Sequence, residues 1–264
     1  MAHYTHGHAE PVLRSHRSRT AENSAGYLLP HLRPGSTLLD VGSGPGTITA
    51  DLTERVAPGR VTALEATEEA LALTAAELAG RGVEADLVTG DAHDLPFPDD
   101  TFDVVHAHQV LQHLADPVTA LRELRRVCRP GGLVAVRDAD YGGFSWWPRP
   151  VGLDRWLALY DDVARANGGE PDAGRRLLGW ALEAGFDAPR VGASVWCFAT
   201  PEERGSWGGM WADRIVSSAL ADQLIAEGRA TRADLEDLAE AWRTWRDSPD
   251  GWFVVVHGEL LGRA

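Results

Sequence analysis

Three glycines fall within five residues in the segment 42-GSGPG-46, between an apolar run and a helical pattern. Such glycines allow a sharp backbone turn and the close approach of a ligand. A phosphate-binding P-loop would continue with Lys and then Ser or Thr, whereas Gly46 is followed by Thr47 and Ile48. The dinucleotide fingerprint places a third glycine where Thr47 stands. The G-x-G-x-G spacing therefore favours a ligand without phosphates, which needs only a wide backbone turn.

Short apolar runs alternate with helical patterns along the rest of the chain. This alternation predicts right-handed βαβ crossovers, and hence a doubly wound α/β fold with a mostly parallel sheet. We expect strands at residues 37–41, 60–65, 86–91, 102–108, 133–138, 190–199 and 252–257. We expect helices over 15–32, after Gly46, after Thr67, after Asp116 and over 174–186. In such sheets ligands bind at the carboxyl ends of the strands.

Acidic residues end two of these strands, Glu65 the second and Asp91 the third. With the segment 39-LDVGSGPGT-47, they make the sequence resemble the class I S-adenosylmethionine (SAM)-dependent methyltransferases. The similarity is to the branch of quinone C-methyltransferases and small-molecule methyltransferases. The segments 90-GDAHDLPFPDDTFDVV-105 and 107-AHQVLQHL-114 also match motifs of that family. The resemblance implies a Rossmann-like sheet of seven strands in which the last strand is antiparallel.

The resemblance covers residues 15–140 well and 174–199 loosely, and it implies a cofactor site. The glycine loop would hold the methionine part of SAM, Glu65 the ribose hydroxyls and Asp91 the adenine amino group. The cofactor-binding candidates are Asp40, Gly42, Ser43, Gly44, Gly46, Glu65, Ala66, Asp91, Ala92, His108, Tyr4 and Arg19. Each of these residues also has an alternative role without a ligand. Glu65 would then be a surface acid beside a helix, Asp91 a turn residue and Arg19 a solvated cation.

Methyl transfer is an in-line displacement at a sulfonium, so the protein mainly aligns the reacting atoms. It needs a base only where the acceptor must lose a proton. The candidate bases are His113 after the fourth strand, Tyr27 on the first helix and His8 near the N-terminus. Packing or capping is the commoner role for His113 and Tyr27. Together with Tyr4 and His6, His8 is also a candidate for a lid over the cofactor.

Two carboxylates, Asp138 and Asp140, follow the fifth strand, near positions where catechol-type methyltransferases hold magnesium. No third acidic or amide ligand accompanies them in the sequence, so we predict no metal. The segment 3-HYTHGH-8 also lacks a further ligand at a convincing spacing, which favours a mobile arm or part of a lid.

All ten tryptophans follow residue 145, and seven of them lie in two expected insertions. Both insertions begin at strand ends that face the cofactor, so we expect them to roof the active site. The expected division is an N-terminal arm or lid 1–14, a SAM-binding core 15–140, a roof insertion 141–173, core 174–199, a helical roof insertion 200–248 and a final strand 249–264. The candidate substrate-pocket residues are Trp146, Trp147, Trp207, Trp211 and Asp140. For any one tryptophan, packing within the roof is the commoner role.

The net charge of −14 argues against a nucleic-acid partner, and no apolar run is long enough to span a membrane. Two cysteines, Cys128 and Cys197, are too few for a disulfide framework, and we expect both to be buried thiols of a cytoplasmic protein. The expected function is methylation, at carbon, oxygen or nitrogen, of a small aromatic acceptor of secondary metabolism by a monomer or homodimer. The alternative is a non-catalytic SAM-binding regulator, which would need no second pocket beneath a tryptophan-rich roof.

Overall fold

The structure is a computed structural model that describes residues 18–264. The N-terminal candidates Tyr4, His6 and His8 lie outside the described residues.

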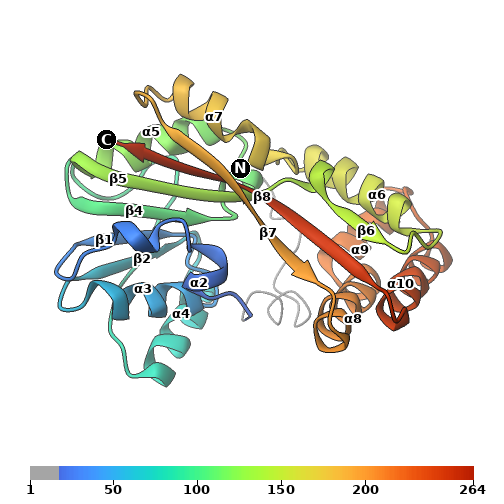
Figure 1. The fold of residues 1–264 in the computed structure, drawn as a ribbon. Helices are drawn as coiled ribbons and strands as arrows, with labels where there is room; N and C mark the ends of the chain where they lie inside the picture. The colour runs from blue at the N-terminus through green and yellow to red at the C-terminus, as the bar shows by residue number, and fades with distance from the viewer. Residues whose placement is uncertain (1–17) are drawn as a thin grey trace.

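Five parallel strands form the first part of the sheet, in the order β3-β2-β1-β4-β5 (Figure 1). Their bounds are β1 Leu38–Val41, β2 Val61–Glu65, β3 Asp86–Thr89, β4 Phe102–His108 and β5 Cys128–Ala139. The alternating pattern of the sequence predicted all five and their parallel pairing. The carboxyl ends of β1, β2 and β4 consequently meet at one edge, where the glycine loop begins.

The last strand, β8 (Trp252–Arg263), is antiparallel and lies between β5 and β7 (Arg190–Phe198). This confirms the predicted antiparallel last strand. The prediction of seven strands is wrong by one, because the short β6 (Ser145–Trp147) also joins the sheet. The cause is the length of β8: β5 pairs with it only as far as His257, and β6 covers the edge that remains.

Helices cover both faces of the sheet, as the doubly wound fold requires (Figure 1). On one face lie α2 (Ala21–Ser24), α3 (Thr47–Val56) and α4 (Glu68–Arg81). On the other lie α5 (Pro117–Val127) and α7 (Ala173–Glu183). Each face has its own cluster of buried apolar side chains.

Local sequence signals explain where these helices begin and end. The apolar residues Ile48, Leu52 and Val56, spaced by four positions, are buried along α3. Asp116 caps α5 by accepting from the Thr119 amide, and Pro117 takes the first helical position.

The expected helix over residues 15–32 is wrong in the described part of the chain. Only the four-residue α2 and a 3-10 turn, Leu29–His31, form there. Pro30 has no amide hydrogen to continue an α-helix, and it is the second residue of the 3-10 turn instead.

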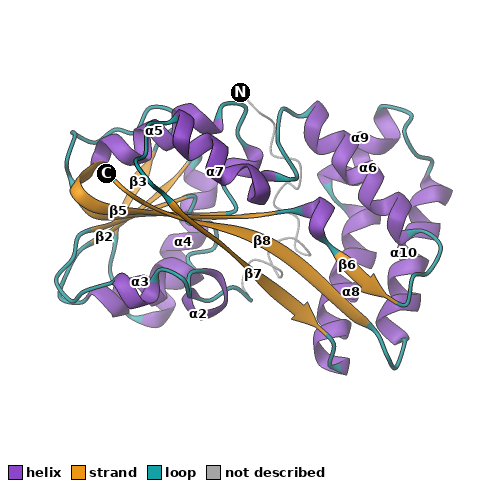
Figure 2. Ribbon diagram, turned by 45° about the horizontal axis from the view of Figure 1, so that its top comes forward, coloured by secondary structure: helices purple, strands orange, loops and turns teal. Residues whose placement is uncertain are grey.

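The roof is the helical layer that packs beside the far half of β7 and β8 (Figure 2). It contains α6 (Leu153–Ala166), α8 (Pro201–Ser217), α9 (Ala219–Ala226) and α10 (Arg232–Asp247). Capping boxes at Thr200 and Thr231 start α8 and α10, within the insertion that the sequence predicted to be helical.

The roof has a hydrophobic core of its own. Trp156 lies at its centre, with ring centroids of Trp211 and Trp242 at 4.6 and 4.8 Å in edge-to-face contact. All three indoles are buried, as is Trp245. Burial of four such side chains, together with Phe253 of β8, is what attaches the roof to the sheet.

Cysteine placement differs from the expectation for one of the two residues. Cys128 is buried, but Cys197 is exposed, because β7 is an edge strand and alternate side chains along it face solvent.

Among the described residues, no helix combines the length and the apolar character needed to cross a bilayer.

Candidate active site

The glycine loop connects β1 to α3 and has an unusual backbone. Gly42, Gly44 and Gly46 have φ angles of +72°, +56° and +90°, a region that costs other residues about 1–2 kcal/mol each. A Cβ at Gly42 would overlap Cγ2 of Val110, and one at Gly46 would lie 2.9 Å from Cα of Thr74. A Cβ at Gly44 would meet no described atom within 4 Å, so this residue faces open space. The loop therefore packs tightly against Val110 and Thr74, while its surface at Gly44 stays open.

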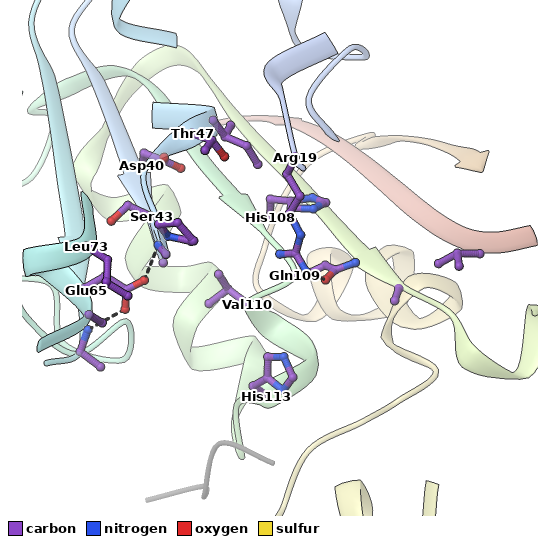
Figure 3. A pocket seen from close by; sticks show the side chains of 18 of the residues that line it. Arg19, Asp40, Ser43, Thr47, Glu65, Leu73, His108, Gln109, Val110 and His113 are labelled. Carbon is purple, nitrogen blue, oxygen red and sulfur yellow. Dashed lines mark hydrogen bonds between the residues drawn. The ribbon is translucent and has the colours of Figure 1, made fainter. Parts of the chain in front are cut away.

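Side chains from β2 and α4 fix the loop. Glu65 Oε1 accepts a hydrogen bond from the Gly44 amide at 2.6 Å, and Oε2 accepts from the Ala66 amide at 3.2 Å (Figure 3). Thr74 Oγ1 donates to the Gly44 carbonyl at 2.8 Å and lies 2.9 Å from Ser43 Oγ. These bonds set both the loop conformation and the orientation of the Glu65 carboxylate.

Asp40 anchors the base of the loop from β1. Its buried carboxylate accepts from Thr49 Oγ1 at 2.6 Å and from His106 Nδ1 at 2.7 Å. Because its partner is a carboxylate, His106 is assigned as protonated at Nδ1. Asp40 therefore connects three elements, β1, α3 and β4, directly beneath the loop.

A cavity of about 320 Å³ opens in front of the glycine loop (Figure 3). One end is lined by the loop and the ends of β1, β2 and β4, and the other by β7, β8 and the roof. The lining residues are Arg19, Asp40, Gly42, Ser43, Gly44, Pro45, Thr47, Ile48, Glu65, Ala66, Thr67, Ala70, Leu73, His108, Gln109, Val110, His113, Leu114, Ala139, Tyr141, Phe144, Trp196, Trp207, Trp211, Arg214 and Val255.

The roof end of the cavity is largely aromatic. Trp207, Trp211 and Arg214 project from one face of α8, where residues spaced by three or four positions align. Tyr141 and Phe144, just before β6, stack with ring centroids 4.4 Å apart. The aromatic rings at this end therefore form an apolar wall of the cavity.

Two histidines line the middle of the cavity, His108 at the end of β4 and His113 in the turn that follows it. Burial lowers the pKa of His108 well below its usual range, and the positive charges of Arg19 and Arg137 lower it further. Burial, with a smaller contribution from Arg19, lowers the pKa of His113 to about 3. Both imidazoles are therefore neutral near pH 7, and neither repels a bound cation.

Gln109 is the residue between the end of β4 and the turn that carries His113. Its φ of +55° is rare outside glycine, and its side chain makes two contacts. Oε1 accepts from an Arg19 guanidinium nitrogen at 2.7 Å, and Nε2 lies 2.8 Å from His257 Nε2. Arg19 also lies over the ring of Trp196, 5.7 Å from its centroid. Gln109 thereby holds Arg19 at the edge of the cavity.

Asp138 lies behind this wall, at the end of β5, and is fully buried. Its Oδ1 accepts from the Gln112 amide at 3.0 Å, and Oδ2 has no hydrogen-bond partner among the described residues. Burial raises the pKa of this carboxyl from 3.8 to about 7.

The raised pKa of Asp138 predicts a pH dependence of stability. Between about pH 4 and 7 the carboxyl is protonated when folded but ionised when unfolded, so its contribution to stability falls as pH rises. Relative to Asp138→Asn, the free energy of unfolding of the unmodified protein should fall by up to about 1.4 kcal/mol per pH unit. The difference should be constant above pH 7. Urea unfolding of both proteins from pH 5 to 8 measures it, and parallel curves throughout would show that Asp138 ionises normally.

Most of the residues predicted from the sequence come together around the cavity. Eleven of them line it: Arg19, Asp40, Gly42, Ser43, Gly44, Glu65, Ala66, His108, His113, Trp207 and Trp211. Seven do not: Tyr27, Gly46, Asp91, Ala92, Asp140, Trp146 and Trp147.

Asp140 and two tryptophans have other roles. The buried Asp140 carboxylate accepts from the Arg175 amide at 2.9 Å and from its Nε at 2.8 Å, which fixes the start of α7. Trp146 is buried against Phe253 in the roof core. Trp147 is 58% exposed. Because strand neighbours point to opposite sides, Trp146 and Trp147 could not both face one pocket. The prediction that these three line the substrate pocket is therefore wrong.

Tyr27 packs against the cluster under α2 and α3, away from the cavity lining. Burial raises the pKa of its hydroxyl well above the usual value, so it stays protonated and is unsuited to act as a base.

Gly46 does not line the cavity, and it serves as the N-cap of α3. Asp91 Oδ1 accepts from the amide of His93 at 2.9 Å and lies 2.7 Å from its Nδ1. Within residues 18–264, neither Asp138 nor Asp140, the two carboxylates considered for magnesium, belongs to a group of side chains that could hold a metal ion.

Sequence reasoning missed several lining residues. Gln109 was detectable, since it directly follows the expected fourth strand. Trp196 and Arg214 gave no local signal, because one lies within a strand and the other within an amphipathic helix. Tyr141 and Phe144 fell in an insertion whose conformation the sequence did not define.

Known proteins resemble this chain along most of its length. A sequence family described as a methyltransferase domain matches residues 39–136. An uncharacterised methyltransferase of Schizosaccharomyces pombe is 36% identical over 98% of this chain and 95% of its own length. A ubiquinone/menaquinone biosynthesis C-methyltransferase of Roseobacter denitrificans is 37% identical over 54% of this chain and 56% of its own length. In fold, the chain is similar to a phosphoethanolamine N-methyltransferase of Haemonchus contortus, solved with phosphomonomethylethanolamine and S-adenosylhomocysteine. The TM-score is 0.56 at 16% identity, over 88% of this chain and 49% of that one.

Proposed function

The chain belongs to the SAM-dependent methyltransferases, and we propose that it methylates a small aromatic metabolite bound between the glycine loop and the tryptophans of α8. One observation carries the proposal. A single cavity is lined by the glycine loop and Glu65 at one end and by Trp207 and Trp211 at the other. A protein that only senses SAM needs the first end alone, whereas a transferase must hold two ligands against each other.

The loop end of the cavity fits SAM by its chemistry. Gly44 faces open space, which lets a ligand approach the backbone closely. Glu65 presents a carboxylate whose two oxygens have lone pairs for the two hydroxyls of a ribose in addition to the Gly44 amide. Arg19 and the backbone at His108 are proposed to hold the carboxylate and amino group of the methionine part. The proposed adenine contacts, Asp91 and Ala92, follow β3 beside this end.

SAM, when bound, supplies an electrophilic methyl group and becomes S-adenosylhomocysteine. The protein's part is to align the acceptor with that group and to exclude water, since positive charge is lost from sulfur during transfer. The rings of Trp207, Trp211 and Phe144 provide an apolar enclosure. His113 stays the candidate base, but its lowered pKa makes it a weak one. This favours acceptors whose nucleophile is already electron-rich, such as an activated aromatic carbon.

The nature of the acceptor is supported by the aromatic lining and by one relative. The Roseobacter denitrificans relative is named as a C-methyltransferase of quinone biosynthesis, which makes carbon methylation of a quinone-like or indole-like ring the first form of the proposal to test. Methylation at oxygen or nitrogen would use the same cavity.

A screen tests the proposal. The protein is incubated with SAM and single aromatic metabolites, namely indoles, phenols, naphthols and reduced quinones, and S-adenosylhomocysteine and product masses are followed. We expect methylated product from at least one ring system and none from aliphatic amines or nucleic acid. Tight binding of SAM without turnover of any aromatic compound would favour the regulatory alternative.

The ribose contact gives a further prediction. Glu65→Gln retains an acceptor for the Gly44 amide but removes the negative charge, so we expect SAM affinity to fall by about 10–100-fold, equivalent to about 1.5–3 kcal/mol. Calorimetric titration with SAM measures this. Glu68→Gln, on the exposed first turn of α4, is the matched control and should leave affinity unchanged. Equal affinities of all three proteins would make Glu65 a surface acid without a role in binding.

A further inference from the structure

We propose that Gln112 is a positioning residue that holds neutral His113 as the tautomer with its hydrogen on Nδ1, so that His113 enters methyl transfer as a hydrogen-bond donor and not as a base. The tautomer follows from hydrogen bonds alone, whereas its catalytic consequence rests on the proposed function. The inference narrows the acceptors to those whose nucleophile needs no proton removed by His113.

The backbone of Gln112 is held on both sides. The residue lies in the 3-10 turn Leu111–His113 that follows β4, and it is only 3% exposed. Its amide donates to Asp138 Oδ1 at 3.0 Å, and its carbonyl accepts from the Glu170 amide at 2.9 Å. These two bonds tie the turn to β5 and to the segment before α7, and so fix the point from which the side chain extends.

The orientation of the Gln112 carboxamide follows from its first side-chain partner. The backbone amide of Ala139 donates to Gln112 Oε1 at 3.0 Å, and a backbone N–H can only donate. Turning the carboxamide over would place its NH2 group against this N–H, and two buried donors would then lack an acceptor, which is costly. The carboxamide nitrogen is therefore the atom that faces His113.

The second partner of the carboxamide is the imidazole of His113, whose Nε2 lies 3.1 Å from Gln112 Nε2. A carboxamide nitrogen donates and does not accept, so His113 Nε2 contributes its lone pair to this bond. A neutral imidazole carries one hydrogen, and the hydrogen bond made by one ring nitrogen sets which nitrogen carries it. The hydrogen of His113 is therefore assigned to Nδ1.

This tautomer bears on catalysis because His113 lines the cavity, whereas Gln112 does not. A general base needs a lone pair directed at the proton that it removes. In His113 the Nε2 lone pair is bound to Gln112, and Nδ1 already carries a hydrogen. Uptake of a proton would first break the bond to Gln112, and burial, with Arg19, already lowers the pKa of His113 to about 3. His113 thus offers the reaction a donor and no available lone pair.

Nitrogen NMR of the free protein with ¹⁵N-labelled histidine tests the tautomer without any acceptor. In a neutral imidazole, the nitrogen that carries the hydrogen and the nitrogen that does not have well-separated ¹⁵N shifts. His113→Gln identifies the His113 signals by their loss, and His106, whose Nδ1 faces the Asp40 carboxylate, is the internal reference for a protonated Nδ1. At pH 7 we expect the Nδ1–H form of His113 to exceed the Nε2–H form by about tenfold or more. A predominant Nε2–H form would overturn the inference.

A variant tests whether Gln112 is the cause. Gln112→Met keeps the length of the side chain and removes the donor, so the excess of the Nδ1–H form should fall by about tenfold. Gln223→Met is the matched control, because Gln223 donates its side-chain amide to Asn167 Oδ1 in the roof at 2.8 Å, and it should leave the ratio unchanged. An unchanged ratio in a folded Gln112→Met would contradict the positioning role. If that variant does not fold, the spectrum of the unmodified protein decides.

The catalytic consequence is tested with the aromatic compound that the screen shows to be methylated. His113→Gln keeps a carbonyl oxygen that can accept from Gln112 but cannot take up a proton, so we expect kcat to fall by less than about tenfold. A general base contributes about 10²–10⁴-fold, and a loss on that scale at unchanged KM would show that His113 is the base after all. If no aromatic compound is methylated, the proposed function fails, and the NMR result still decides the tautomer.

Discussion

Replacement of Gly42 by alanine is expected to reduce SAM affinity by at least about 100-fold, the largest effect that we predict for a single methyl group. The added Cβ would overlap Cγ2 of Val110, and the positive φ of Gly42 would be strained as well. Strain of about 1–2 kcal/mol and overpacking of about 1–3 kcal/mol together exceed what the loop can absorb in place. It must move, and the backbone contacts to SAM move with it. Calorimetric titration with SAM measures the loss.

Two further variants isolate the cause. Gly35→Ala is the matched control, since Gly35 has a similar φ of +87° but no described atom within 4 Å of the added Cβ. It should lose a little stability and no SAM affinity. Gly42→Ala combined with Val110→Ala removes the overlap and should recover part of the affinity. If Gly42→Ala alone binds SAM as tightly as the unmodified protein, the loop does not form the cofactor site.

Replacement of Trp242 by alanine should lower the free energy of unfolding by about 3–5 kcal/mol, the range for deleting a large buried aromatic side chain. Trp242 is 0% exposed, and the ring centroids of Trp156 and Phe253 lie 4.8 and 5.4 Å from its own. It also stacks on Trp211, at 5.8 Å and an interplanar angle of 11°. Loss of that support should reduce turnover of an aromatic acceptor, while affinity for S-adenosylhomocysteine changes by less than about threefold because Trp242 does not line the cavity. Urea unfolding, a turnover assay with the aromatic acceptor and calorimetric titration with S-adenosylhomocysteine measure these three effects.

Trp147→Ala is the matched control for the roof. Its side chain is 58% exposed and donates a hydrogen bond to Asp250 at 3.0 Å. We expect a change in stability of less than about 1 kcal/mol and unchanged turnover. Equal losses in both variants would mean that the roof core does not depend on the tryptophan cluster.

The core of the fold was predictable because its signals are local. The glycine spacing of residues 42–46 and the acid at Glu65 defined the loop end of the site, and the family resemblance drawn from them is confirmed. Capping residues such as Asp116 and Thr231 fixed helix starts through hydrogen bonds to the residue three positions further along the chain. Each of these features depends on neighbours within a few residues, which a sequence displays directly.

The roof was predictable only in outline. Its composition indicated aromatic packing, but whether a tryptophan faces the cavity depends on contacts between elements far apart in the sequence, as between Trp156 and Trp242. Strand β6, which separates Trp146 from Trp147, follows from the length of β8 rather than from its own three residues. The pairing of Asp140 with Arg175 is also long-range. Such contacts distinguish a pocket residue from a core residue, and no local pattern encodes them.

The most direct test of the central claim is a crystal structure with S-adenosylhomocysteine and a methylated aromatic product from the screen bound together. We predict the amino-acid part of the cofactor product against Gly42 and Gly44, its ribose on Glu65, and the product ring in contact with Trp207 and Trp211. The new methyl group should lie between ring and sulfur. A product ring bound outside the roof, or a cofactor product bound away from the glycine loop, would contradict the claim that one cavity serves both partners.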